Sequence, residues 1–225
     1  MATDGAGRKR IAPEPEGYSV TDSGPPSLLD YAEMAYACYT HEDSKKLPGW
    51  DMHGWYNVTI GKEAITLASF INDSNIVLAF SGTDPKNFNH LRADLAIGIG
   101  VLPASANKAN EIFELILRTS SGRRPSLVGH SLGGALAQYV GFKFPYTNSV
   151  TPIRYTTFCA PGIARWLEKK PETTDGGVNY FVENDWVHTF GGAKTGKSIS
   201  LGKSPASFPA CHTMGEVLKL VRKHQ

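Results

Sequence analysis

The stretch that decides the fold is residues 126–136, Ser-Leu-Val-Gly-His-Ser-Leu-Gly-Gly-Ala-Leu, which contains the pattern Gly-x-Ser-x-Gly. An apolar run typical of a strand comes before the pattern, and a run typical of a helix with a small-residue face follows it. A sharp strand-to-helix turn of this kind holds a serine in a strained conformation, and glycines let the strand and the helix approach each other. We therefore predict a nucleophile elbow in which Gly129, His130 and Gly133 surround the nucleophile Ser131.

The start of the helix after Ser131 favours negative charge. Its first backbone N–H groups have no partner within the helix, and the helix dipole adds partial positive charge there. The N–H of Leu132 is therefore predicted to stabilise an oxyanion formed beside Ser131. The alternative is a glycine-rich turn between packed elements, in which Ser131 only caps the helix.

A serine hydroxyl needs a base that removes its proton, and three histidines follow Ser131 in the chain. His224 lies in the last two residues of the sequence, where a helix end is expected to fray. His188 follows the candidate acid by only three residues, so it has little freedom to turn back toward the serine. His212 lies in the predicted loop before the last helix and is predicted to be the base.

The base in turn needs a carboxylate that orients it. Asp185 follows the strand-like residues 178–182, so we expect it at the same edge of the sheet as the serine. Asp175 lies in a Thr-Thr-Asp-Gly-Gly turn, and Glu183 is expected to point into the sheet by alternation. The alternative for Asp185 is a solvated loop residue.

A second oxyanion donor is expected at the end of an earlier strand. Residues 80–84, Phe-Ser-Gly-Thr-Asp, form a strand end followed by a glycine turn. Thr83 offers both a backbone N–H and a hydroxyl to an oxyanion. The alternative is a simple turn in which this hydroxyl bonds to the backbone.

An amphipathic helix of about three turns is expected from Ser27. Ser27 and Asp30 form an S-x-x-D capping signature at its start. Apolar residues then recur at helical spacing: Leu28, Leu29, Ala32, Ala35, Tyr36 and Tyr39.

The remaining segments predict an α/β fold. Residues 64–71 and 76–80 are strand-like and flank a turn-forming Asn-Asp-Ser-Asn, which indicates an antiparallel hairpin. Further strands are expected over 126–128, 154–159 and 178–183, and further helices over 105–118, 132–142 and 214–223. Alternation of strands and helices predicts a mostly parallel central sheet with an N-terminal antiparallel hairpin and helices on both faces.

The composition of the 225 residues is that of a single globular domain. Residues 1–26 contain almost no large apolar side chain and are predicted to be a flexible tail before a domain at 27–225. A net charge of +2 with scattered basic residues excludes nucleic acid as an expected partner. Three widely spaced cysteines indicate neither a disulfide framework nor a zinc site. No apolar run follows the N-terminal basic triplet, so a cytoplasmic location is expected, with export by a signal-independent route left open.

Several stretches together resemble the class 3 lipase superfamily of α/β-hydrolases, including its bacterial branch of uncharacterised lipase-like domains. The resemblance covers most of residues 27–225 and rests on LLDYAEMAYACY, AFSGTD, SLVGHSLGGALA, TTFCAPG and VNYFVENDWVH. It implies a nucleophile, an acid, a base and an oxyanion residue, which correspond to Ser131, Asp185, His212 and Thr83. The arginine usual before the glycine of the oxyanion motif is Ser81 here, so the ion pair that such an arginine supports is missing.

The resemblance also implies a mobile lid after the oxyanion strand. Residues 87–103 carry apolar side chains among several glycines and fit this description. An ordinary buried connection is the equal alternative.

These features predict a serine carboxylic-ester hydrolase that acts through an acyl-enzyme and needs no metal or cofactor. The expected partner is a small-molecule or lipid ester, such as a glyceride or a phospholipid, with transient contact at a membrane surface. Two alternatives remain open: a catalytically silent hydrolase fold used for binding, and an acyltransferase or peptidase on the same fold.

Overall fold

A computed structural model describes residues 23–40, 47–60, 63–83, 104–120, 122–148, 153–167 and 176–224. Within these residues, seven strands form one sheet whose spatial order follows the chain. The strands are β1 (Asp51–Ile60), β2 (Glu63–Ile71), β3 (Asn75–Phe80), β4 (Arg124–His130), β5 (Arg154–Phe158), β6 (Gly177–Phe181) and β7 (Lys197–Ser200).

The sheet is mostly parallel, as the sequence predicted. β1, β2 and β3 pair antiparallel, whereas each pair from β3 to β7 is parallel. All six residues of β3 are buried, as are the last five of β4, because both faces of these central strands are covered. The hairpin expected over 64–71 and 76–80 corresponds to β2 and β3. β1 and β7, the two edge strands, were not predicted.

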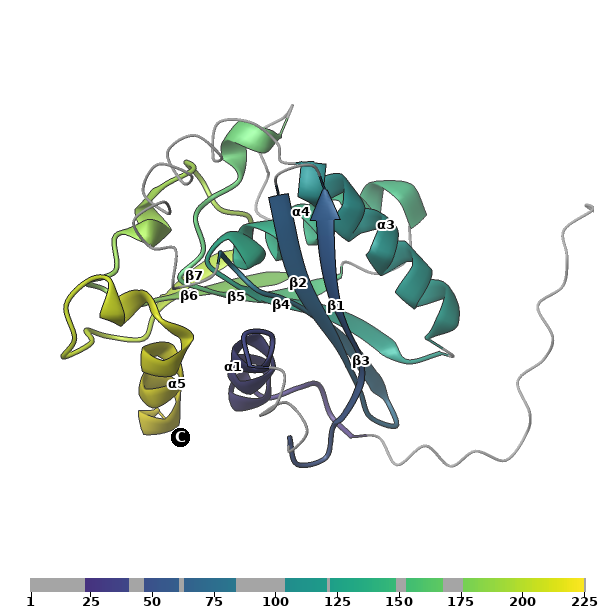
Figure 1. The fold of residues 1–225 in the computed structure, drawn as a ribbon, viewed down its shortest axis with the longest axis horizontal. Helices are drawn as coiled ribbons and strands as arrows, with labels where there is room; N and C mark the ends of the chain where they lie inside the picture. Colours follow the sequence, from purple (N-terminus) through teal and green to yellow (C-terminus); the bar gives the residue numbers. More distant parts are fainter. Residues whose placement is uncertain are drawn as a thin grey trace, which may run out of the picture.

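Helices cover both faces of the sheet (Figure 1), which confirms the α/β prediction. α1 (Leu28–Ala37) and α5 (Met214–Lys223) pack together on one face, and α3 (Ala104–Thr119) and α4 (Leu132–Asn148) pack together on the other. Short 3-10 helices follow at η3 (Ala164–Trp166), η4 (Val187–Thr189) and η5 (Ala210–His212).

The predicted capping box starts α1. The Asp30 N–H donates to the Ser27 hydroxyl at 3.1 Å, and the Ser27 N–H donates to the Asp30 carboxylate at 2.7 Å. The helix ends at Ala37, so Tyr39 lies two residues beyond it instead of on its apolar face.

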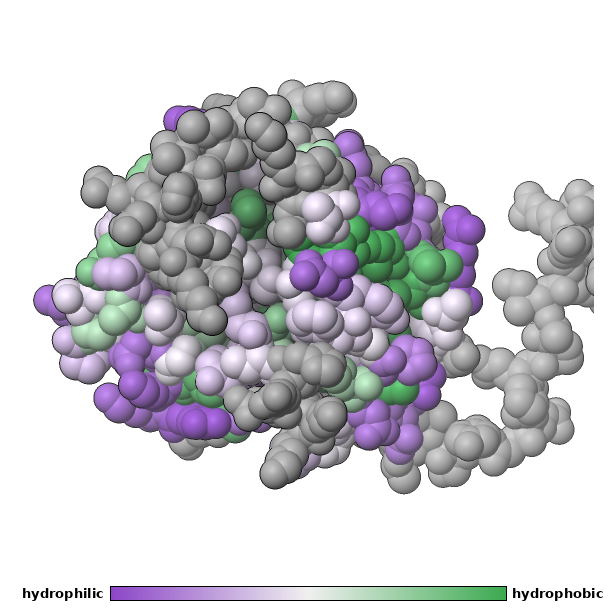
Figure 2. Space-filling view, in the orientation of Figure 1, coloured by the Kyte–Doolittle hydropathy of each residue, from purple (hydrophilic) through white to green (hydrophobic). Residues whose placement is uncertain are grey.

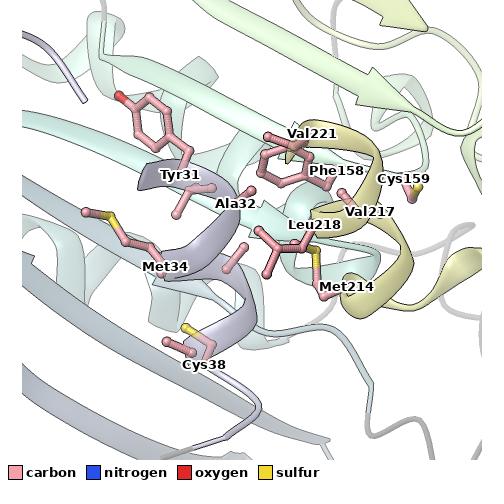
Figure 3. Packing of buried hydrophobic residues seen from close by; sticks show 14 of the residues in the cluster. Tyr31, Ala32, Met34, Cys38, Phe158, Cys159, Met214, Val217, Leu218 and Val221 are labelled. Carbon is pink, nitrogen blue, oxygen red and sulfur yellow. The ribbon is translucent and has the colours of Figure 1, made fainter. Parts of the chain in front are cut away.

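Among the described residues, the two large clusters of buried apolar side chains lie on opposite faces of the sheet, and a small third one surrounds Val187. Figure 3 shows side chains of α1 and α5 meeting over one face, where Ala32 and Leu218 lie beside Phe158 of β5. On the other face, Phe80 and Leu127 pack against Leu136 of α4. These two clusters fix α1, α5 and α4 on the sheet, and the ends of those helices carry the site.

Ser23 and Gly24, which precede the predicted domain boundary at Ser27, form hydrogen bonds with the domain. The carbonyl oxygens of Ser23 and Gly24 accept hydrogen bonds from the Asn75 side chain, and Arg124 donates to the Ser23 carbonyl at 2.6 Å. The rest of the predicted tail, residues 1–22, lies outside the described residues.

The surface is mixed in polarity. On the face shown in Figure 2, apolar residues gather beside α3, which carries the 63% exposed Leu115. Exposed apolar side chains are ordinary on a protein surface. Within the described ranges, none of the helices combines the length and the apolar character needed to span a bilayer.

Candidate functional site

Ser131 sits at a tight turn between β4 and α4. Its φ is 55°, a left-handed conformation that non-glycine residues rarely adopt. A Cβ on Gly129 would lie 2.2 Å from the Gly133 carbonyl oxygen, and one on Gly133 would lie 2.4 Å from the oxygens of Phe80 and Ser81. The turn is therefore sharp, and close backbone approach requires its glycines; that it serves as a nucleophile elbow stays a prediction.

Ser131, His212 and Asp185 form one hydrogen-bonded chain of buried side chains. The His212 Nδ1 lies 2.6 Å from the Asp185 Oδ2, and its Nε2 lies 2.9 Å from the Ser131 Oγ. A carboxylate can only accept, so Nδ1–H donates to Asp185; in a neutral ring Nε2 then carries no proton and accepts from the Ser131 hydroxyl. In this arrangement the ring is set to take a proton from the serine.

The Asp185 carboxylate is buried yet ionised. Burial by itself disfavours its charge, but hydrogen bonds and attraction from His212, the Cys159 thiol and the Val187 N–H outweigh this, and the pKa of Asp185 lies below its ordinary value. The Val187 N–H donates to its Oδ1 at 3.0 Å. The Val187 N–H and the His212 ring therefore hold the carboxylate in place.

Cys159 is a member of the site that sequence reasoning missed. It follows β5, has a φ of 50°, and is completely buried. Burial raises the pKa of its thiol well above the ordinary value, so the thiol stays protonated beside Asp185, where the Cys159, Asp185 and His212 ligand atoms lie within 4.8 Å of one another. Its sequence signals were its place at the end of a strand and within the stretch TTFCAPG.

A metal ion would have to compete with these hydrogen bonds. Among the residues that the structure describes, the compact group of potential ligands is Cys159, Asp185 and His212, whose ligand atoms lie within 4.8 Å of one another. Asp185 and His212 already satisfy each other, so this group fits an acid–base pair better than a metal site. The three cysteines of the chain are free and buried.

The topology explains why these residues meet. β3 to β6 are parallel, so their carboxyl ends lie at one edge of the sheet. Thr83 follows β3, Ser131 follows β4, Cys159 follows β5 and Asp185 follows β6. His212 reaches the same edge from η5, just before α5.

The predicted oxyanion residues are the chain neighbours of Ser131 and of Gly82, which packs against Ser131. Leu132 is the first residue of α4, so its N–H has no acceptor within the helix. Thr83 follows Gly82, and a Cβ on Gly82 would lie 2.7 Å from the Ser131 Cβ. The loop after β3 is therefore packed directly against the serine. Ser81 stands where the resemblance implies an arginine. Its side chain is buried and uncharged, so it cannot form the ion pair of such an arginine.

A second hydrogen-bonded chain lies behind the first, and sequence reasoning missed it. The His130 Nδ1 lies 2.8 Å from the Tyr39 hydroxyl, and its Nε2 lies 2.7 Å from the backbone oxygen of His212. The Gly82 N–H donates to the Tyr39 hydroxyl at 2.6 Å. Burial, together with repulsion from His212, lowers the pKa of His130 from its ordinary value to about 3, so this ring is neutral.

His188 and His224, the two histidines that the sequence disfavours as bases, have hydrogen-bond partners other than Ser131. The His188 Nδ1 bonds to the Asp185 backbone oxygen, and the His224 Nε2 lies 3.1 Å from the Leu201 oxygen.

The expectation that Glu183 points into the sheet is wrong. Glu183 is exposed and accepts a hydrogen bond from Ser200, because β6 ends at Phe181 before the alternation reaches it. Asp175 and the predicted lid, 87–103, lie outside the described residues.

The sheet, the elbow and the loops at the carboxyl edge define an α/β-hydrolase fold. Comparison with solved structures agrees. Lip2 lipase from Yarrowia lipolytica is similar with a TM-score of 0.55 and 12% identity over 77% of both chains. Lipase II from Rhizopus niveus aligns with a TM-score of 0.49 and 17% identity over 70% of this chain and 71% of that one. The carboxylesterase EstE1, from a metagenomic library, aligns with a TM-score of 0.44 and 9% identity over 88% and 94%.

No family model and no curated protein matches the sequence. The likeness to the fungal lipase Lip2 is therefore one of fold.

Proposed function

We propose that this protein is a serine carboxylic-ester hydrolase that acts through an acyl-enzyme. The observation that carries the proposal is the hydrogen-bonded chain from Ser131 through His212 to Asp185, with distances of 2.9 and 2.6 Å. A serine in this arrangement differs from an ordinary buried serine because its proton has an oriented acceptor.

In the first step the Ser131 Oγ attacks the ester carbonyl carbon while its proton moves to the His212 Nε2. The Asp185 carboxylate stabilises the resulting imidazolium through Nδ1–H. The negative charge on the former carbonyl oxygen is stabilised by the N–H of Leu132 and by Thr83. The imidazolium then protonates the leaving alcohol, which departs and leaves an ester on Ser131.

The second step repeats the chemistry with water. His212 takes a proton from the water, the hydroxide attacks the acyl carbon, and the tetrahedral intermediate collapses to release the acid. Ser131 recovers its proton from His212. The three side chains therefore account for every proton transfer, and the oxyanion donors account for the charge on the intermediates.

The substrate class that we favour is a lipid or other acyl ester. The sequence resemblance to class 3 lipases and the fold shared with Lip2 lipase support it. An alcohol in place of water in the second step would make the enzyme an acyltransferase.

The test is reaction with a fluorophosphonate probe, which needs an activated serine, together with hydrolysis of p-nitrophenyl esters of graded chain length. We expect labelling and turnover that Ser131→Ala abolishes. Ser69→Ala, which removes a buried hydroxyl from β2 of the same sheet, is the matched control and should behave as the wild type. A folded wild type that neither labels nor hydrolyses any ester would show instead a silent hydrolase fold, and product analysis with alcohol acceptors would detect acyl transfer.

A further inference from the structure

We propose that Tyr39 and His130 are positioning residues, forming a hydrogen-bonded relay that holds the oxyanion loop at Gly82 and the backbone of the base His212 in fixed relation to each other. This inference rests on the proposed function, because it assigns a role in that reaction. It goes beyond that function because neither residue belongs to the nucleophile, the acid, the base or the oxyanion donors.

The direction of every hydrogen bond in the relay follows from its two ends. The backbone oxygen of His212 can only accept, so the His130 Nε2 carries the proton and donates to it at 2.7 Å. The neutral ring then has an unprotonated Nδ1, which accepts from the Tyr39 hydroxyl at 2.8 Å. The hydroxyl oxygen of Tyr39 in turn accepts from the Gly82 N–H at 2.6 Å. No bond in the relay can be reversed without breaking another.

The two ends of the relay contact two parts of the proposed site, the oxyanion loop and the base. Gly82 precedes Thr83, and a Cβ on Gly82 would lie 2.8 Å from the Tyr39 hydroxyl as well as 2.7 Å from the Ser131 Cβ. At the other end, His130 bonds to the main chain of the residue whose ring bonds to Ser131. A shift of either end would therefore change the geometry around the serine.

The surroundings keep His130 in the state that the relay needs. His130 is 4% exposed, and its ring centroid lies 4.7 Å from that of His212. Each of its nitrogens has one partner, so a proton added to Nδ1 would lose the Tyr39 bond and stand beside the ring that becomes cationic during catalysis. A neutral ring avoids that repulsion.

The decisive variant is Tyr39→Phe, which keeps the ring and removes only the hydroxyl. We expect kcat for a p-nitrophenyl ester to fall about tenfold to a hundredfold, the range that follows from a displaced catalytic group, with KM little changed. Tyr36→Phe, which removes a hydroxyl from α1 outside the relay, is the matched control and should leave both constants unchanged. Thermal unfolding of both variants measures any general loss of stability.

A double-mutant cycle distinguishes the relay from two independent contacts. If Tyr39 acts through His130, adding Tyr39→Phe to His130→Gln should cost far less in kcat than it costs alone. Should His130→Gln not fold, the His130 imidazole resonances of the wild type and of Tyr39→Phe give the same information, because only the wild type has a hydrogen bond to Nδ1.

The outcomes separate the two proposals. A wild type that reacts with fluorophosphonate, combined with a Tyr39→Phe enzyme of normal kcat, overturns the relay and leaves the proposed function standing. Equal losses for Tyr39→Phe and Tyr36→Phe, in step with equal losses of stability, would also overturn it, since the effect would then be structural. A folded wild type without fluorophosphonate labelling overturns the proposed function and the relay with it.

Discussion

Gly82 and Ser131 are in such close contact that no side chain fits between them. A Cβ placed on Gly82 would lie 2.7 Å from the Ser131 Cβ and 2.9 Å from the His130 backbone oxygen. Real Cβ atoms essentially never approach other heavy atoms this closely. The loop after β3 and the turn at Ser131 therefore form one packed unit.

This contact predicts the effect of Gly82→Ala. The added methyl group must push the loop away from Ser131, so we expect hydrolysis of p-nitrophenyl esters to fall at least about a hundredfold. Gly24→Ala is the control, because nothing lies within 4 Å of a Cβ at that position. Fluorophosphonate labelling of Gly82→Ala at the wild-type rate would contradict the close packing.

Replacing Asp185 by asparagine should impair the base without removing it. An amide nitrogen facing Nδ1 would favour the tautomer in which Nε2 carries the proton, and this nitrogen then cannot accept from Ser131. The loss in kcat is expected to approach about four orders of magnitude, as for the corresponding change in a serine protease. Adding Asn184→Asp to Asp185→Asn tests whether a carboxylate at the neighbouring position of the same turn can restore kcat. Near-normal kcat for Asp185→Asn would argue against Asp185 as the acid.

Two substitutions distinguish the effect of the Cys159 thiol from the effect of its strained backbone conformation. Cys159→Ala and Cys159→Ser both keep a side chain at a φ of 50°, but only serine retains a proton donor for Asp185. We expect Cys159→Ala to lose about tenfold in kcat, as for a lost hydrogen bond to a charged group, and Cys159→Ser to recover most of it. Equal activities of the two variants would show that the thiol does not support the acid.

The low pKa of His130 predicts a loss of stability in mild acid. This ring has a pKa of about 3 in the folded protein and an ordinary value of 6.5. Between these values the unfolded chain binds a proton that the folded protein does not, so the free energy of unfolding falls as the pH decreases through this range. His188, whose pKa is also lowered by burial, contributes in the same direction.

Urea unfolding at about pH 7.5 and about pH 5 measures this effect. His130→Gln should show a smaller difference between the two conditions than the wild type, because it lacks the titrating ring. His53→Gln, which replaces an exposed histidine of β1, should keep the full difference. The same pH dependence in all three proteins would exclude His130 as its source.

The catalytic candidates were predictable because the chemistry demands particular residue types in a particular order. Ser131 stood out through its glycines, Asp185 through its place after a strand, and His212 through its place before the last helix. The structure brings the three together, and their catalytic roles remain a prediction. Tyr39 and Cys159 were not predictable, since a tyrosine at helical spacing and a cysteine after a strand are ordinary core residues in sequence.

The fold was predictable where strands are buried and not at its edges. β3 and β4 are apolar runs, because both of their faces are covered. β1 is mostly exposed or partly exposed, and its pairing with β2 shifts register between Met52 and Gly54. β7 has only four residues. Such edge strands are held by pairing with a neighbour, and their own side chains give little signal.

The distance in sequence between Ser131 and His212 has a consequence for biosynthesis. The imidazole lies 81 residues after the hydroxyl to which it bonds, and it is held by η5 and α5, the last elements of the chain. Loops of that length close only after a large entropic cost has been met. A nascent polypeptide that has just completed the turn at Ser131 would thus lack its histidine partner, and the proposed reactivity toward esters would emerge only when α5 docks on α1.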